Sequence, residues 1–145
     1  MDSTQKQVKW APGAHKALME LPESVRREFG HELFMVQKGE QPENASPFEG
    51  SSGANIMKLV ERYDKNTYRC VYTAKLESGV YVLHAYMKKS KEGKSTPQQV
   101  IELVEERYKT AIEMDKRERA EATAFAAKQA KGTDVVKSDR GKTKL

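Results

Sequence analysis

Residues Tyr63–Lys91, YDKNTYRCVYTAKLESGVYVLHAYMKKSK, decide the fold of this chain of 145 residues. β-Branched and aromatic residues dominate two runs within the stretch, which is typical of neighbouring β-strands. The segments Asp64–Thr67 and Glu77–Gly79 separate the runs with residue types that favour turns. We therefore expect three consecutive strands at about 56–63, 67–76 and 79–87.

Side chains alternate between the two faces of a strand, so the turns determine which residues meet. In the expected register, Arg69 lies opposite Arg62 on one neighbour and opposite Tyr86 on the other. Val71 lies opposite His84. One face then carries basic and apolar residues: Lys58, Val60, Arg62, Arg69, Val71, Thr73, Val82, His84 and Tyr86. The other is more apolar, and we expect helices to pack there: Leu59, Tyr63, Tyr68, Cys70, Tyr72, Ala74, Tyr81, Leu83 and Ala85.

Two helices are expected before the sheet. Apolar residues recur at helical spacing over 14–21 and again over 25–36, with Pro22 between them and Gly39 as a stop signal. Val8 and Trp10 indicate a short edge strand, and residues 39–55 are rich enough in Gly and Pro to predict a long loop.

A long helix is expected after the sheet. Thr96 is a candidate N-cap, with Pro97 at the first helical position and Gln99 completing a capping box. A core-facing stripe follows: Val100, Leu103, Val104, Arg107, Tyr108, Ala111 and Ile112. The fold class is therefore α+β, with an N-terminal helical hairpin on a twisted, mainly antiparallel sheet of three to four strands. Residues 1–112 form the domain, 113–131 a charged helical extension, and 132–145 a basic disordered tail.

Composition favours anionic partners. The net charge is +5, the pI is about 9.2 and the mean hydropathy is −0.81. The single cysteine, Cys70, excludes an intrachain disulfide and a cysteine-based zinc site. No signal peptide and no apolar run of membrane-spanning length is present in the sequence, so we expect a cytoplasmic protein. We find no nucleotide-binding or metal-binding motif, and expect no cofactor and no metal.

The candidate site lies where the last strand ends. His84 has an ordinary pKa suited to acid–base work, and Tyr86 can stack on a base of single-stranded RNA. The basic run that follows, Lys88–Lys94, can hold phosphates and stabilise charge on a phosphoryl centre. The plainer interpretation is a packed histidine beside a solvated loop.

Three strings together resemble the RelE/HigB-type toxins of type II toxin–antitoxin pairs: ERYDKNTYRCVYTAK, VYVLHAYMKKSKEGKSTP and QQVIELVEERYK. The similarity covers roughly residues 8–112 and is strongest to the phage-derived HigB-like branch. It implies an endoribonuclease that cuts mRNA, usually in the ribosomal A site, and is silenced by a cognate antitoxin, a small helix-turn-helix protein. It also implies metal-free chemistry, in which the RNA 2′-OH attacks the adjacent phosphate.

The resemblance assigns roles to individual positions. The expected catalytic residues are His84, Arg69, Lys88 and Tyr86, and the expected RNA- and phosphate-binding residues are Arg62, Lys58, Lys89, Lys91 and Lys94. Relatives commonly carry Glu-Leu-Arg where this chain has Lys58-Leu59-Val60, so one basic residue is missing. Two other functions remain open: a ParE-like inhibitor of DNA gyrase without nuclease activity, and a non-toxic nucleic-acid-binding module.

Overall fold

A computed structural model describes residues 5–50, 55–88 and 96–143, with side chains described as far as Ala130. Within these residues, the sheet has five strands in the order β1-β5-β4-β3-β2. Strand β1 pairs in parallel with β5, and all the other pairings are antiparallel. The strands are β1 (Val8–Trp10), β2 (Ala45–Pro47), β3 (Met57–Tyr63), β4 (Asn66–Thr73) and β5 (Val80–Lys88).

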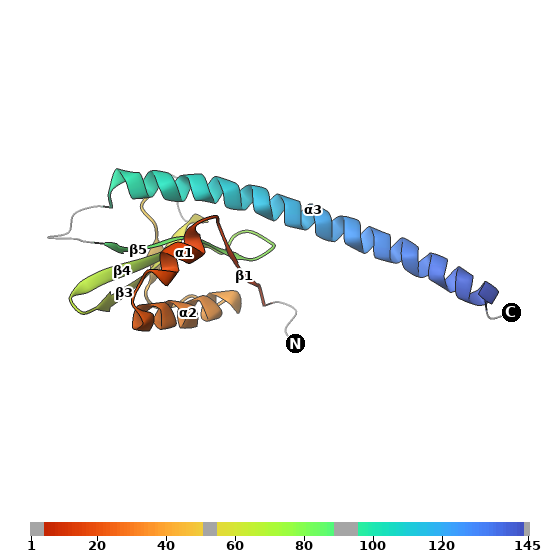
Figure 1. Cartoon of the computed structure of the whole chain (residues 1–145), viewed down its shortest axis with the longest axis horizontal. Coiled ribbons are helices and arrows are strands. Elements are labelled where there is room, and N and C mark those ends of the chain that lie inside the picture. Colours follow the sequence, from red (N-terminus) through yellow and green to blue (C-terminus); the bar gives the residue numbers. More distant parts are fainter. Residues whose placement is uncertain (1–4, 51–54, 89–95, 144–145) are drawn as a thin grey trace. The chain divides into compact units, whose positions relative to one another are not determined.

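Helices cover both faces of this sheet (Figure 1). Helix α1 (Ala14–Met19) lies against β5, and α2 (Glu23–Gln37) lies against β3 and β5. The first part of α3 (Gln98–Thr143), as far as Asp115, lies on the opposite face. Asp115 anchors it by accepting a hydrogen bond of 2.7 Å from the backbone N–H of Ser78.

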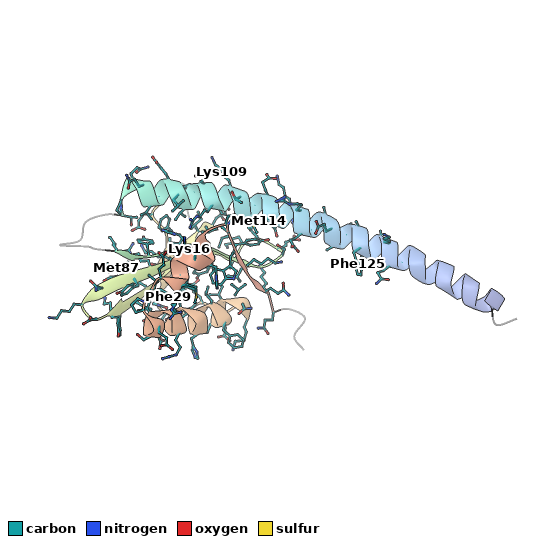
Figure 2. All side chains as sticks on the ribbon, in the orientation of Figure 1. Lys16, Phe29, Met87, Lys109, Met114 and Phe125 are labelled. Atoms are coloured by element: carbon teal, nitrogen blue, oxygen red, sulfur yellow. The ribbon has the colours of Figure 1, made fainter. Side chains whose placement is uncertain are left out.

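The apolar stripe of α2 explains its packing. Val25, Phe29, Leu33 and Val36 recur at helical spacing and are all buried. Phe29, labelled in Figure 2, is fully buried against the sheet side that carries Leu59 and Cys70. Gly39 follows the helix with φ +87°, a backbone angle that glycine adopts without strain. The predicted end of α2 is therefore confirmed. Most of the predicted core face is buried, but Tyr63 at the end of β3 is 45% exposed.

The mixed α+β fold with a long C-terminal helix is confirmed, but the sheet has five strands rather than three to four. The additional strand is β2, which lies within the predicted loop and pairs with β3. Three residues are too few for a periodic signal, and Pro47 at the end of the strand further obscures it. The helices also do not share one face as expected, because α3 uses the opposite face, where the apolar Val71 is fully buried.

The β3–β4 register differs from the expected one by two residues. Tyr63 pairs with Asn66 around a two-residue turn, in which Asp64 and Lys65 both have positive φ. Arg62 therefore lies opposite Thr67, and Val60 lies opposite Arg69. Because side chains alternate with a period of two, this shift leaves the residues of β3 on their predicted faces. The β4–β5 pairing does depart from the prediction beyond Val71, because Thr73 lies opposite Tyr81 and Val82 lies opposite Tyr72 after an irregularity between Val71 and Tyr72.

Residues Met1–Asp115 form one compact unit and Lys116–Leu145 a second. In the second unit α3 remains helical to Thr143, whereas the sequence predicts that the helix ends near Lys131. No proline follows Pro97, so nothing in the sequence breaks the helix sharply. Its side chains are exposed as far as Ala130, including Phe125. In the part of the chain that the structure describes, no helix combines the length and apolarity required to cross a bilayer.

Candidate nucleic-acid interface

Nine residues of β3, β4 and β5 form a grid on the sheet face that α3 partly covers, and we call this grid the site face. Each row crosses the three strands through paired residues. The rows are Arg62–Thr67–Lys88, Val60–Arg69–Tyr86 and Lys58–Val71–His84. The predicted pairings of Arg69 with Tyr86 and of Val71 with His84 are confirmed. The site face therefore brings together six of the nine predicted site residues.

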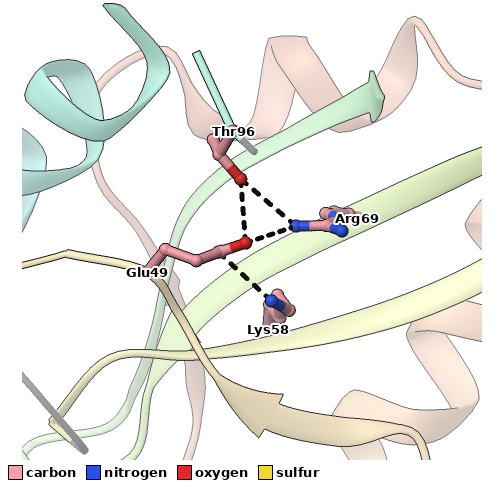
Figure 3. A network of polar contacts seen from close by, with 4 residues as sticks. All are labelled: Glu49, Lys58, Arg69 and Thr96. Atoms are coloured by element: carbon pink, nitrogen blue, oxygen red, sulfur yellow. Dashed lines mark hydrogen bonds and ion pairs between the residues drawn. The ribbon is translucent and has the colours of Figure 1, made fainter. Parts of the chain in front are cut away.

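A carboxylate occupies the centre of this basic cluster (Figure 3). Lys58 Nζ lies 3.1 Å from Oε1 of Glu49, and Arg69 Nη1 lies 3.1 Å from its Oε2. Thr96 Oγ1 donates to Oε2 at 3.0 Å and accepts from Arg69 Nη1 at 3.3 Å. We call Lys58 Nζ, Arg69 Nη1 and Thr96 Oγ1 the anion site. Burial raises the pKa of Glu49, but hydrogen bonds from its own backbone and these three residues outweigh that effect and lower it to about 2.

His84 is bound by an arginine of α3. Arg107 Nη1 donates to His84 Nδ1 and to the carbonyl oxygen of Leu83, both at 3.0 Å. Burial, and secondarily the Arg107 charge, lower the pKa of His84 from 6.5 to about 4. Because Nδ1 accepts this hydrogen bond, a neutral His84 carries its proton on Nε2. Gly13 makes room for the guanidinium, since a Cβ there would lie 2.6 Å from Arg107 Nη2.

Tyr86 joins the histidine to the anion site. Its ring stacks on that of His84, with centroids 5.3 Å apart and planes inclined by 17°. Its hydroxyl is buried and has no hydrogen-bond partner among the described residues. Burial raises the pKa of Tyr86, while the nearby Arg69 and Thr96 offset part of that rise. The Tyr86 hydroxyl thus lies beside Arg69 and Thr96, close enough for both to affect its pKa, but without a hydrogen bond of good geometry.

Lys88 and Arg62 lie in the row nearest the β3–β4 turn. Lys88 is close enough to the cluster that burial and the charges of Arg69 and Lys58 lower its pKa, against the opposing effect of Glu49. Arg62 is exposed. The predicted binding residues Lys89, Lys91 and Lys94 lie outside the described residues.

Comparison with known protein families now places the chain. The family described as "Phage derived protein Gp49-like (DUF891)" matches residues 16–109, which is more than half of the chain and includes the whole site face, Glu49, Thr96 and Arg107. The chain belongs to the Gp49-like family. This is a toxin-like family related to the RelE/HigB toxins, as the sequence resemblance indicates. No curated protein matches the chain.

Three residues at the site of this Gp49-like chain were not predicted from its sequence: Glu49, Thr96 and Arg107. Glu49 follows β2 in a segment without periodicity. Its partners Lys58, Arg69 and Thr96 lie 9, 20 and 47 residues further along the sequence. The hydroxyl of Thr96, expected to cap α3, instead donates to Glu49, and α3 begins at Gln98. Arg107 did carry a signal, because an arginine inside an apolar stripe needs a polar partner on the sheet.

A separate acidic cluster is the candidate metal-binding group of this Gp49-like chain. The carboxylates of Glu28, Glu32 and Glu61 lie within 4.8 Å of one another. Burial, a hydrogen bond with Glu61 and repulsion from both acidic neighbours raise the pKa of Glu32 to about 8. Near neutral pH, Glu32 can therefore share a proton with Glu61, and this accounts for their close approach without a cation.

Proposed function

We propose that this Gp49-like protein is the toxin of a toxin–antitoxin pair and an endoribonuclease that cleaves mRNA, in the ribosomal A site. The observation that carries the proposal is the convergence of Lys58, Arg69 and Thr96 on one carboxylate. Two cations and a hydroxyl arranged around an oxyanion are the groups that bind an RNA phosphate. The toxin-like family supports the same interpretation.

The proposed reaction is metal-free transesterification. The RNA 2′-OH gives its proton to a water molecule, and its oxygen forms a bond to the adjacent phosphorus while the bond from phosphorus to the 5′-oxygen breaks. The 5′-oxygen takes up a proton, so the products are a 2′,3′-cyclic phosphate and a 5′-OH. Lys58 and Arg69 stabilise the charge that develops on the phosphoryl oxygens. Lys88, whose pKa is lowered, supplies the proton to the leaving oxygen.

In the proposed reaction, stabilisation of the charge on the phosphoryl oxygens contributes more than base catalysis by His84. His84 has a pKa of about 4, and its Nε2 holds a proton while Nδ1 is bonded to Arg107, so it is a weak base at neutral pH. In the arrangement observed, His84 and Tyr86 serve as hydrogen-bond donors to the phosphate. His84 accepts the 2′-OH proton only after its own proton moves to Nδ1 and the Arg107 hydrogen bond breaks.

A ParE-like inhibitor of DNA gyrase is the second candidate. Val60 lies opposite Arg69 at the β3 end of the middle row, where relatives with the Glu-Leu-Arg string have an arginine. A basic face that lacks one cation and has no strong base suits binding without cleavage. The partners we propose for the first candidate are a small helix-turn-helix antitoxin, mRNA and the ribosome, all in the cytoplasm.

Mapping of mRNA 5′ ends after induction in bacterial cells separates the two candidates. We expect the wild-type chain to arrest growth and to produce cuts in phase with codons, and we expect Arg69→Ala and His84→Ala to reduce those cuts. Plasmid supercoiling is measured in the same cells. Growth arrest with altered supercoiling and no cuts in phase with codons would show that the chain acts on gyrase instead.

A further inference from the structure

The anion site is already filled by the chain itself. Both carboxylate oxygens of Glu49 are bound, Oε1 by Lys58 and Oε2 by Arg69 and Thr96 (Figure 3). A non-bridging phosphate oxygen pair offers acceptors to the same donors. The Glu49 carboxylate and a phosphate cannot occupy the anion site together, because two negative charges bound to the same donors would repel each other.

Burial differs between the two sides of this contact. The side chains of Lys58 and Arg69 are 13% and 12% exposed, whereas that of Glu49 is 38% exposed. Cations this buried are destabilised without an anion beside them. The carboxylate, in contrast, is open to solvent and can leave by rotation of its side chain. The backbone beside Glu49 is anchored, since Phe48 is buried and its N–H donates a 2.9 Å hydrogen bond to the carbonyl of Ile56. We therefore expect only the Glu49 side chain to move.

The carboxylate also leaves donors unused. Arg69 Nε and the Tyr86 hydroxyl are buried and have no hydrogen-bond partner among the described residues. Both belong to the same row of the site face, directly opposite each other on β4 and β5. A buried donor without an acceptor is unfavourable, so a ligand with more oxygens than a carboxylate would bind with more of its hydrogen bonds satisfied.

We propose that Glu49 is an internal competitor for the phosphate: it occupies the anion site in the resting chain, and an RNA phosphate displaces it. The inference rests on the proposed function for the source of the phosphate. Thr96 is thereby a phosphate ligand, and the Glu49 side chain rotates away when substrate binds. Acidification near neutral pH does not open the site, because the pKa of Glu49 is about 2 and the carboxylate remains charged.

Glu49→Gln tests the proposal, since it removes the charge and keeps the shape. The probes are inorganic phosphate, followed by calorimetry, and a fluorescent single-stranded oligodeoxynucleotide, which lacks the 2′-OH and is not cleaved. We expect the variant to bind both probes about tenfold more tightly, because the fraction of chains with an open site rises. Glu49→Ala, which leaves no side chain in the anion site, is expected to bind at least as tightly.

Glu102→Gln is the control for net charge. Glu102 is exposed on α3, contacts Gln98 and lines the same groove as Glu49 without touching the anion site. We expect its affinity for both probes to stay within about twofold of the wild type. Equal gains in the Glu49 and Glu102 variants would show that only general charge matters, and would overturn the proposal.

The outcomes separate this proposal from the proposed function. Unchanged or weaker binding by folded Glu49→Gln and Glu49→Ala means that Glu49 orders the site rather than competing for it, even where the wild type cleaves RNA. Tighter phosphate binding without RNA cleavage by any variant supports the competitor and removes the nuclease. If the Glu49 variants bind inorganic phosphate more tightly but not the oligodeoxynucleotide, RNA is not the ligand that displaces Glu49.

Discussion

Arg107 donates a hydrogen bond of 3.0 Å to Nδ1 of His84, and this contact between α3 and β5 decides what the histidine can do. The imidazole is held neutral, with its proton on Nε2, and it stacks on Tyr86. A histidine proposed from the sequence as an acid–base group is thus fixed in one tautomer by a residue 23 positions away. In this arrangement, what His84 can offer a ligand is the hydrogen bond that its Nε2–H donates.

Arg107→Met tests this arrangement. We expect the pKa of His84 to rise above its wild-type value of about 4, but to stay below 6.5, because burial is the larger cause of the shift. NMR titration of the His84 imidazole signals measures this pKa. In the wild type, the contribution of His84 to folding stability should fall as the pH drops from 6.5 to 4, since the unfolded chain binds the proton more tightly. A wild-type pKa at or above 6.5 would contradict the Arg107 contact.

Arg69→Ala is expected to reduce RNA cleavage by about 10²–10³-fold, because it removes a donor that stabilises charge in the transition state. Arg62→Ala is the matched control, since Arg62 is exposed and lies in the row nearest the turn. The loss of cleavage rate in Arg62→Ala should be small and should diminish with added salt. Single-turnover kinetics on a defined RNA compares the two. Equal losses would indicate a diffuse electrostatic surface instead of a built site.

Tyr86→Phe separates the hydroxyl from the ring. The hydroxyl is buried without a partner among the described residues, so its removal should leave stability unchanged or raise it by about 1 kcal/mol. Cleavage should fall by about tenfold or more, because a donor to the phosphate is lost. Urea unfolding and cleavage rates are measured together. Unaltered cleavage would limit Tyr86 to stacking on His84.

The β4–β5 half of the site face was predictable from sequence. Next to the turn near Gly79, however, the register differs by one residue from the predicted one, because Tyr72 pairs with Val82 and Thr73 with Tyr81. The irregularity between Val71 and Tyr72 compensates for this difference, so Arg69 pairs with Tyr86 and Val71 with His84 as predicted. Between β3 and β4 the predicted turn was too long, so the predicted register was wrong by two residues. The faces did not change, because side chains alternate along a strand with a period of two.

The anion site and the histidine partner were not predictable in the same way. Glu49, Thr96 and Arg107 come from a loop, the segment before α3 and α3 itself, and only tertiary packing brings them to the sheet. No spacing rule connects Glu49 to Arg69 or Arg107 to His84. Only the position of Arg107 within an apolar stripe indicated a buried polar contact.

Glu32→Gln is expected to change how stability depends on pH. The pKa of Glu32 is about 8 in the folded chain and near 4.5 when unfolded, so its protonation favours folding at low pH, and that contribution is lost as the pH rises from 4.5 to 8. Urea unfolding at the two ends of this range should show a smaller fall for the variant than for the wild type. Glu23→Gln, exposed on the same helix, should retain the wild-type fall. Parallel curves for all three proteins would contradict the raised pKa.

The most direct measurement of the central claim is the chemistry of the cut ends. Purified wild-type protein is incubated with ribosomes programmed with a defined mRNA, and the fragments are analysed by mass spectrometry. The proposed transesterification predicts a 2′,3′-cyclic phosphate on the upstream fragment, a 5′-OH on the downstream fragment, and no cut where the 2′-OH is replaced by hydrogen. Intact mRNA, or cutting that persists at the 2′-deoxy position, would contradict it.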